Sequence, residues 1–149
     1  MASQEPTVLR APMVIEYPFS RTTGPVIGAF LTGLREGVLI GIKGSDGRVL
    51  CPPMEYDPVT SESLSELVEL AQTGTVTTWS WTEPRRYQPL EHAFAWALVL
   101  IDGTDTPMLH AVDAGSVDNM STGMRVQVRW RAEREGHIND IECFEPVAS

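Results

Sequence analysis

The residues Met124–Glu133, MRVQVRWRAE, alternate between apolar and polar side chains, as in a strand with one buried and one exposed face. The two faces carry different residues: Val126, Val128 and Trp130 on one, and Arg125, Gln127, Arg129 and Arg131 on the other. We therefore expect the apolar set to fill a core. Truncation of Trp130 to alanine should cost about 3 to 5 kcal/mol, and truncation of Arg129 under about 1 kcal/mol.

Similar segments, rich in β-forming residues and separated by glycine-containing turns, lie on both sides of this one. The five expected strands are Thr75–Glu83, Ala93–Asp102, Met108–Asp113, Met124–Glu133 and Ile138–Phe144. Short strands with these turns predict a small Greek-key barrel of the OB type over residues 74–149. The fold class is therefore mainly β.

The preceding half of the chain has a different organisation. Residues 1–22 contain prolines without periodicity and predict an extended N-terminal arm. From Thr23, apolar residues at helical spacing predict an amphipathic helix that Gly37 ends. Residues 63–70 stay open between a strand and a helix, because Ser63 and Glu66 also suit a capping box. Residues 23–73 thus form a helix plus a second, smaller segment.

That smaller segment contains Gly41–Pro53, GIKGSDGRVLCPP, which is similar to the first knuckle of a zinc ribbon without its C-x-x-C pair. Asp57–Thr60 stands where a second cysteine knuckle would follow. A structural zinc needs four nitrogen or sulfur ligands, and the two cysteines of the chain, Cys51 and Cys143, occupy neither knuckle. We predict a degenerate, metal-free ribbon held by packing of Val49, Leu50, Val59 and Leu64 or by a partner.

Several short motifs carry a family resemblance over about four fifths of the chain. They are Phe30–Gly37, Gly47–Val49 with Pro52 and Pro53, Gly74–Val76, Ala95–Asp102 and Gly123–Val126. In their order and spacing the chain resembles the zinc-ribbon/OB-fold proteins that accompany thiolases, sterol-carrier-type thiolases or aldolases, and MaoC-like hydratases in acyl-CoA metabolism. The resemblance implies a non-catalytic accessory subunit in a hetero-oligomer with a thiolase-like enzyme, a class that includes steroid side-chain aldolases. The missing zinc ligands are the main departure.

Composition narrows the classes of function. The net charge of −9 argues against a polyanionic partner over the whole surface. No apolar run has the length of a membrane span, and the N-terminus lacks the features of a signal peptide, so we expect a cytoplasmic protein without membrane contact. Two distant cysteines suit a reducing compartment, and both read as small buried hydrophobes.

Four arginines are candidates for contact with coenzyme A: Arg85 and Arg86 between the first two barrel strands, and Arg129 and Arg131 on the polar face of the fourth. The alternative for each is a solvated surface. Candidates for a partner interface are Phe30, Leu31 and Leu34 on the helix and Trp79 and Trp81 on the first strand. The two tryptophans also suit a barrel core or a stacking platform for single-stranded nucleic acid, which is the alternative function.

Sequence motifs for catalysis are missing: there is no nucleophile elbow, P-loop, dinucleotide fingerprint or helical zinc motif. His92, His110 and His137 are scattered through different segments. We therefore expect no enzyme activity, no bound cofactor and no metal for this chain alone, and a stand-alone acyl-CoA hydrolase or transferase is the least favoured function.

Overall fold

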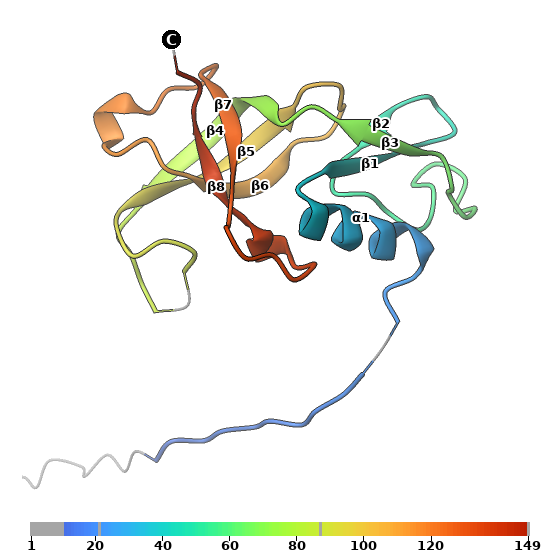
Figure 1. Ribbon diagram of the computed structural model, residues 1–149, viewed down its shortest axis with the longest axis horizontal. Helices are drawn as coiled ribbons and strands as arrows, with labels where there is room; N and C mark the ends of the chain where they lie inside the picture. The colour runs from blue at the N-terminus through green and yellow to red at the C-terminus, as the bar shows by residue number, and fades with distance from the viewer. Residues whose placement is uncertain (1–10, 21, 87, 149) are drawn as a thin grey trace, which may run out of the picture.

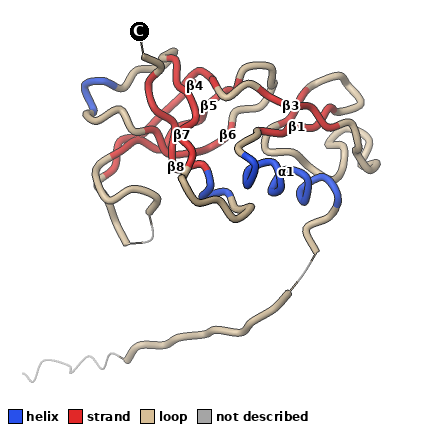
Figure 2. The backbone as a smooth tube through the Cα atoms, viewed as in Figure 1, coloured by secondary structure: helices blue, strands red, loops and turns tan. Residues whose placement is uncertain are grey.

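The computed structural model describes residues 11–20, 22–86 and 88–148, and shows one helix beside a small sheet, followed by a barrel (Figure 1). The elements in chain order are α1 (Pro25–Glu36), β1 (Leu39–Lys43), β2 (Val49–Leu50), β3 (Leu67–Leu70), β4 (Thr73–Thr82), β5 (Phe94–Ile101), β6 (Met108–Val112), η1 (Val117–Asn119), β7 (Arg125–Trp130), η2 (Ile138–Asp140) and β8 (Ile141–Pro146). Figure 2 shows that strands are the main regular structure of the described chain, with loops between them. The expected fold class, mainly β with an OB-type barrel and an N-terminal helix, is confirmed.

Helix α1 begins at Pro25, where a missing N–H costs nothing, and ends at Gly37, which has a left-handed φ of 77°. The amide of Val38 donates to the Gly33 carbonyl, at 2.8 Å, and closes the last turn. The buried face of the helix carries Val26, Phe30, Gly33 and Leu34. Gly33 is needed there because a Cβ atom would lie 2.9 Å from Ile40 Cδ1 and from the Val38 carbonyl oxygen.

The degenerate ribbon forms a three-stranded antiparallel sheet in the order β2–β1–β3. Of the strand and the helix that the sequence allowed for residues 63–70, the structure has a strand, β3 over Leu67–Leu70, which pairs with β1. Leu50 and Leu64 pack with Val26 and Ile42 in a small cluster under the helix. The expectation that Val59 helps to hold the ribbon is wrong, because its side chain is 61% exposed.

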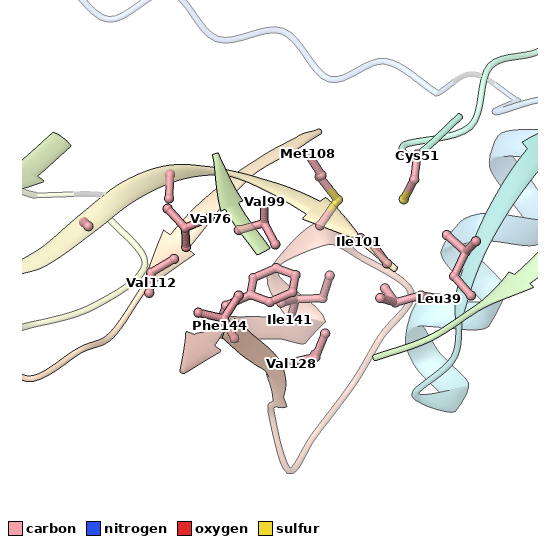
Figure 3. Close-up of a cluster of buried hydrophobic side chains, with 14 of the residues drawn as sticks. Leu39, Cys51, Val76, Val99, Ile101, Met108, Val112, Val128, Ile141 and Phe144 are labelled. Atoms are coloured by element: carbon pink, nitrogen blue, oxygen red, sulfur yellow. The ribbon is translucent and has the colours of Figure 1, made fainter. Parts of the chain in front are cut away.

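The barrel closes in the order β4–β5–β6–β8–β7. Strands β6 and β8 are parallel and meet only at Val112 and Phe144, whereas the other neighbours are antiparallel. One continuous core joins the barrel, the helix and the ribbon sheet, as the side chains around Phe144, Ile101 and Leu39 in Figure 3 illustrate. The helix and ribbon are therefore fixed to the barrel by shared apolar packing.

Strand β7 confirms the alternation of the sequence in part. Val126 and Val128 are buried as expected, but Trp130 is only half-buried. The pairing of β7 with β8 shifts between Arg129 and Trp130, and this irregularity turns the indole toward the barrel edge, where Nε1 donates to Gln72 Oε1 at 2.8 Å. The strand also ends at Trp130, three residues before the expected limit.

The last expected strand begins later than the sequence suggested. Residues Ile138–Asp140 form the 3-10 turn η2 instead of the start of β8. A capping box causes this, because His137 Nδ1 accepts from the Asn139 amide while the Asp140 carboxylate accepts from the His137 amide.

Residues 11–20 of the expected arm run along no other element and are exposed throughout; residues 1–10 and 21 of that arm lie outside the described residues (Figure 1). Cys51 and Cys143 are buried free thiols, as predicted. In the described chain, no helix is long and apolar enough to cross a membrane.

Candidate functional site

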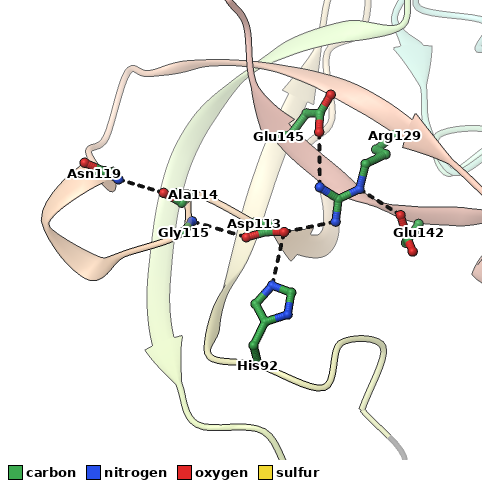
Figure 4. A network of polar contacts seen from close by, with 8 residues as sticks. All are labelled: His92, Asp113, Ala114, Gly115, Asn119, Arg129, Glu142 and Glu145. Atoms are coloured by element: carbon green, nitrogen blue, oxygen red, sulfur yellow. Dashed lines mark hydrogen bonds and ion pairs between the residues drawn. The ribbon is translucent and has the colours of Figure 1, made fainter.

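Arg129, one of the arginines proposed to contact coenzyme A, lies at the centre of an ion-pair network on the outside of the barrel (Figure 4). Its guanidinium donates to Glu142 Oε2 at 2.7 Å, to Glu145 Oε2 at 3.1 Å and to Asp113 Oδ2 at 3.0 Å. The same Asp113 oxygen lies 3.1 Å from His92 Nε2. All three nitrogen atoms of the Arg129 guanidinium thus already donate to carboxylates.

The network changes the titration of its members. Partial burial acts to lower the pKa of Arg129, but the three carboxylates outweigh it and raise that pKa. Burial likewise acts to raise the pKa of Asp113, and hydrogen bonds from Arg129 and His92 reverse the direction and lower it. Arg129 therefore joins β7 to β8 and to the end of β6, and an anionic ligand would have to displace carboxylates to reach it.

Arg131 lies just beyond β7 in a different environment. Its amide donates to the Asp140 carbonyl at 2.9 Å, and its exposed guanidinium has no ion-pair partner among the described residues. The side chain borders a pocket of about 460 Å³ that is also lined by residues of the β4–β5 loop, β5, β6 and η2. That volume falls within the usual range of small-molecule sites.

The pocket combines apolar and polar groups. Its apolar lining is Pro89, Trp96, Leu109 and Ile138. Its polar lining is Gln88, His110, Arg131 and Asn139. Trp96 is half-buried and makes an edge-to-face contact with Phe94, at 5.2 Å between ring centroids, which fixes the indole against the barrel.

His110 is the buried polar member of this pocket. The residue is 6% exposed, and its ring packs edge-on against Phe144 at 5.8 Å. Burial lowers the pKa of His110, although backbone groups of Ala111 and Ile138 act in the opposite direction, so the ring is neutral at pH 7. Nδ1 is buried and has no hydrogen-bond partner among the described residues. The sequence offered no signal for this role, because His110 occupies an ordinary position in a short strand.

Arg85 and Arg86 lie in the exposed loop between β4 and β5, as predicted. The Arg85 amide donates to Gln88 Oε1 at 2.8 Å, so this loop turns back toward the pocket that Gln88 and Pro89 line. Of the four arginines, the structure thus brings Arg131 and the Arg85 loop to the same side of the barrel, while Arg129 belongs to the ion-pair network.

The residues proposed as a partner interface are divided between core and surface. Phe30 is 5% exposed and Leu34 is fully buried in the chain's own core, so neither side chain can reach a partner in this fold. Leu31, Trp79 and Trp81 are half-buried and pack against the same core. Because the two tryptophans are partly covered, they do not form an open stacking platform.

The largest exposed apolar side chains lie elsewhere, in the arm. Met13, Val14, Ile15, Tyr17 and Phe19 are each about 70 to 80% exposed. The sequence signal was present, since MVIEYPF is an apolar run outside any periodic element. A contiguous exposed run of this kind is unusual on a monomeric surface.

The degenerate ribbon has a carboxylate between its two knuckle loops. Asp57, 3% exposed, accepts hydrogen bonds from the Ser45 amide of the first loop at 2.7 Å and from the Val59 and Thr60 amides of the second at 2.6 and 3.0 Å. The Ser45 bond above all lowers the pKa of Asp57, to about 2. Asp57 therefore ties together the two loops that thiolates and zinc join in a true ribbon.

Among the described residues, the geometry forms neither a metal site nor an activated thiol. Within residues 11–20, 22–86 and 88–148, no three His, Cys, Asp or Glu side chains are grouped to hold a metal ion. Burial raises the pKa of both Cys51 and Cys143 to about 12, which suppresses the reactive thiolate.

Comparisons with known proteins agree with the fold. Residues 67–131 match the family of the ChsH2 C-terminal OB-fold domain. The "Ltp2-ChsH2(DUF35) aldolase" has a similar chain, with a TM-score of 0.62 and 19% identity over 85% of this chain and 98% of that one. A DUF35-family protein of unknown function from Sulfolobus solfataricus has a TM-score of 0.58 and 20% identity over 71% of this chain and 77% of that one.

A search among curated proteins found no match. The resemblance that the sequence suggested is thus confirmed for the OB fold and for a match to the ChsH2 OB-fold domain, which is confined to β3 and most of the barrel.

Proposed function

We propose that this chain is a non-catalytic accessory subunit that binds a thiolase-like enzyme, of the steroid side-chain aldolase or thiolase type, and supports binding of its acyl-CoA substrate. The observation that carries the proposal is the fold match along 98% of a chain of the Ltp2-ChsH2(DUF35) aldolase, together with the ChsH2 family match of the barrel. The buried, protonated cysteines are in keeping with a non-catalytic role.

The exposed arm is the element best suited to reach the enzyme. Residues 11–20 present apolar side chains that no other described element covers, and such a run gains free energy when a partner groove removes it from water. We therefore shift the proposed contact from Phe30 and Leu34 to the arm, with Leu31, Trp79 and Trp81 as half-buried neighbours. In Figure 1 the arm extends below α1 and the barrel, clear of every other described element.

The coenzyme A contact is assigned to Arg85, Arg86 and Arg131, since Arg129 is engaged by three carboxylates. These arginines can bind phosphate oxygens at the border of the enzyme's substrate channel. Single-stranded nucleic acid is not supported as a ligand, because the overall charge is −9 and Trp79 and Trp81 pack against the core.

Co-expression with a thiolase-superfamily enzyme encoded beside this chain tests the proposal. We expect a hetero-complex by size exclusion with light scattering, and acyl-CoA turnover that requires both proteins. An Ile15→Ser, Phe19→Ser double variant should weaken the complex without lowering the melting temperature, because neither side chain contributes to the core. An Ser20→Ala variant of the same arm is the matched control.

Two results would contradict the proposal: turnover by the isolated chain, or a chain that stays separate from every candidate enzyme. The coenzyme A contact is tested apart from this, with an Arg85→Ala, Arg86→Ala double variant in the assembled complex. An unchanged KM for acyl-CoA in that variant would remove these two residues from the contact and leave the accessory role intact.

A further inference from the structure

We infer that residues 13–19 of the arm bind as an added β-strand along an exposed strand edge of the thiolase-like enzyme, and that the odd-numbered residues make the contact. The inference rests on the proposed function, because it states how the arm holds that enzyme. The arm is extended in Figure 1, and among the described residues none forms a hydrogen bond with residues 11–20. Its backbone donors and acceptors are therefore open to a partner.

The side chains of the arm differ between its two faces. In an extended chain, successive side chains point to opposite faces. The odd-numbered face carries only hydrophobic side chains: Ala11, Met13, Ile15, Tyr17 and Phe19. The even-numbered face carries Pro12, Val14, Glu16, Pro18 and Ser20. This alternation is typical of a strand that lies with one face on a protein surface and the other in water.

The two prolines distinguish the two edges of this strand. The N–H and C=O groups of one residue point to the same edge of a strand, and those of the next residue point to the opposite edge. Pro12 and Pro18 are both even-numbered and have no N–H, so the even edge lacks two donors. Every odd-numbered residue from 13 to 19 keeps its donor. The odd edge can therefore pair completely with a partner strand, while the even edge resists the addition of a further strand.

The same prolines favour the bound conformation before the partner arrives. Proline fixes its own φ, and it disfavours the helical region for the residue before it, here Ala11 and Tyr17. A segment that is already extended loses less conformational entropy on binding than a flexible one. The arm is therefore better suited to strand addition than to folding into a helix on the enzyme.

The edges within this chain fit the arm less well than an edge on the enzyme. The ribbon sheet ends in β2 and β3, which have two and four residues and are shorter than the arm segment 13–19. The barrel is closed, and the part of β4 past its pairing with β7 leads to Glu83. Pairing there would join two copies that each carry a charge of −9, which opposes their association. An enzyme strand edge beside an apolar face matches both the backbone and the odd-numbered side chains.

The first test compares two neighbouring aliphatic residues in the complex of the full chain with the enzyme, with Kd measured by biolayer interferometry. Val14 and Ile15 are similar in exposure, at 74% and 68%. Ile15→Ser should weaken binding about tenfold or more, because about three methylene-sized groups lose their burial. Val14→Ser should stay within about twofold, because its side chain faces water in the bound strand.

The second test places a proline on each edge. Ile15→Pro removes a donor from the odd edge and should bind about fivefold or more weakly than Ile15→Ala, which is the control for the lost side chain. Glu16→Pro removes a donor from the even edge and should bind within about twofold of Glu16→Ala. Neither Ile15 nor Glu16 contributes to the core, so all variants should have the melting temperature of the unmodified chain in circular dichroism.

Several results would overturn the inference. Equal weakening by Val14→Ser and Ile15→Ser would show that the arm does not bind as an alternating strand. Equal weakening by the two proline variants would show that the odd edge is not selected. An unchanged Kd in every variant would move the contact away from the arm and leave the accessory role intact.

Two further results concern the partner. Self-association of the unmodified chain that Ile15→Ser abolishes would assign the strand edge to a second copy instead of the enzyme. Absence of any complex between the unmodified chain and the candidate enzymes would contradict the accessory role itself, and the inference with it.

Discussion

Replacement of Leu34 by alanine distinguishes a helix that holds the chain's own core from one that serves mainly as a docking surface. The Leu34 side chain is fully buried in the core shared by helix, ribbon and barrel. Removing a buried leucine side chain costs about 2 to 5 kcal/mol, depending on how far the surroundings collapse into the cavity.

Collapse is restricted here, because α1 cannot move closer to the sheet. Gly33 already lies so near Ile40 and the Val38 carbonyl that even a Cβ atom would be 2.9 Å from each. We therefore expect a loss in the upper part of that range, about 3 to 5 kcal/mol, for Leu34→Ala. In a domain of this size such a loss is a large part of the total stability.

The assay is urea unfolding of the isolated chain, followed by circular dichroism, with the m-value compared between variants. Leu31→Ala is the matched control on the same helix, and its half-buried side chain should cost about 1 kcal/mol. If Leu34→Ala stays within about 1 kcal/mol of the unmodified chain and instead weakens the enzyme complex, the core assignment of the helix is refuted.

Three further predictions concern polar and thiol groups. Asp57→Asn should lower the melting temperature at pH 7 and should make stability depend less on pH between about pH 4 and 2. The reason is that a carboxyl group with a lowered pKa contributes stability above its normal pKa of 3.8, and this stability is lost as the pH falls toward 2. An unchanged pH dependence of unfolding in the variant would contradict the role of Asp57 in joining the two ribbon loops. Arg129→Met should lower the free energy of unfolding in urea by about 1 to 3 kcal/mol, since it leaves three carboxylates facing one another. A loss below about 0.5 kcal/mol would show that Arg129 behaves as a solvated surface residue. Cys51 and Cys143 should react with a thiol reagent at pH 8 only as fast as the chain unfolds, and rapid labelling of the native protein would contradict their burial.

Features that repeat along the chain could be predicted from sequence. The period of two in β7 placed Val126 and Val128 in the core, and the helical spacing before Gly37 located α1. Features that depend on contacts between distant segments could not. The shift in strand pairing that half-exposes Trp130 requires β8, and the turn that replaces the start of β8 depends on the fit of His137 to Asp140.

The candidate site follows the same division. The sequence located the arginines of β7 on the outer face, but it could not show that Arg129 meets Asp113, Glu142 and Glu145 while Arg131 has no such partner. Those partners are separated from Arg129 by 13 to 16 residues and lie on β8 or directly after β6. The pocket beside His110 likewise draws on five separate segments, which no single stretch of sequence can indicate.

The start of α1 has a consequence for the order in which this chain can fold during synthesis. Gly24 provides no side-chain cap, and the amides of Val26 and Ile27 instead donate to Glu55 Oε1 at 3.0 and 2.9 Å. The ribosome adds Glu55 nearly 30 residues after these amides. A nascent chain that ends before Glu55 thus carries a helix with an uncapped first turn, and the helix becomes fully anchored only when the ribbon has emerged.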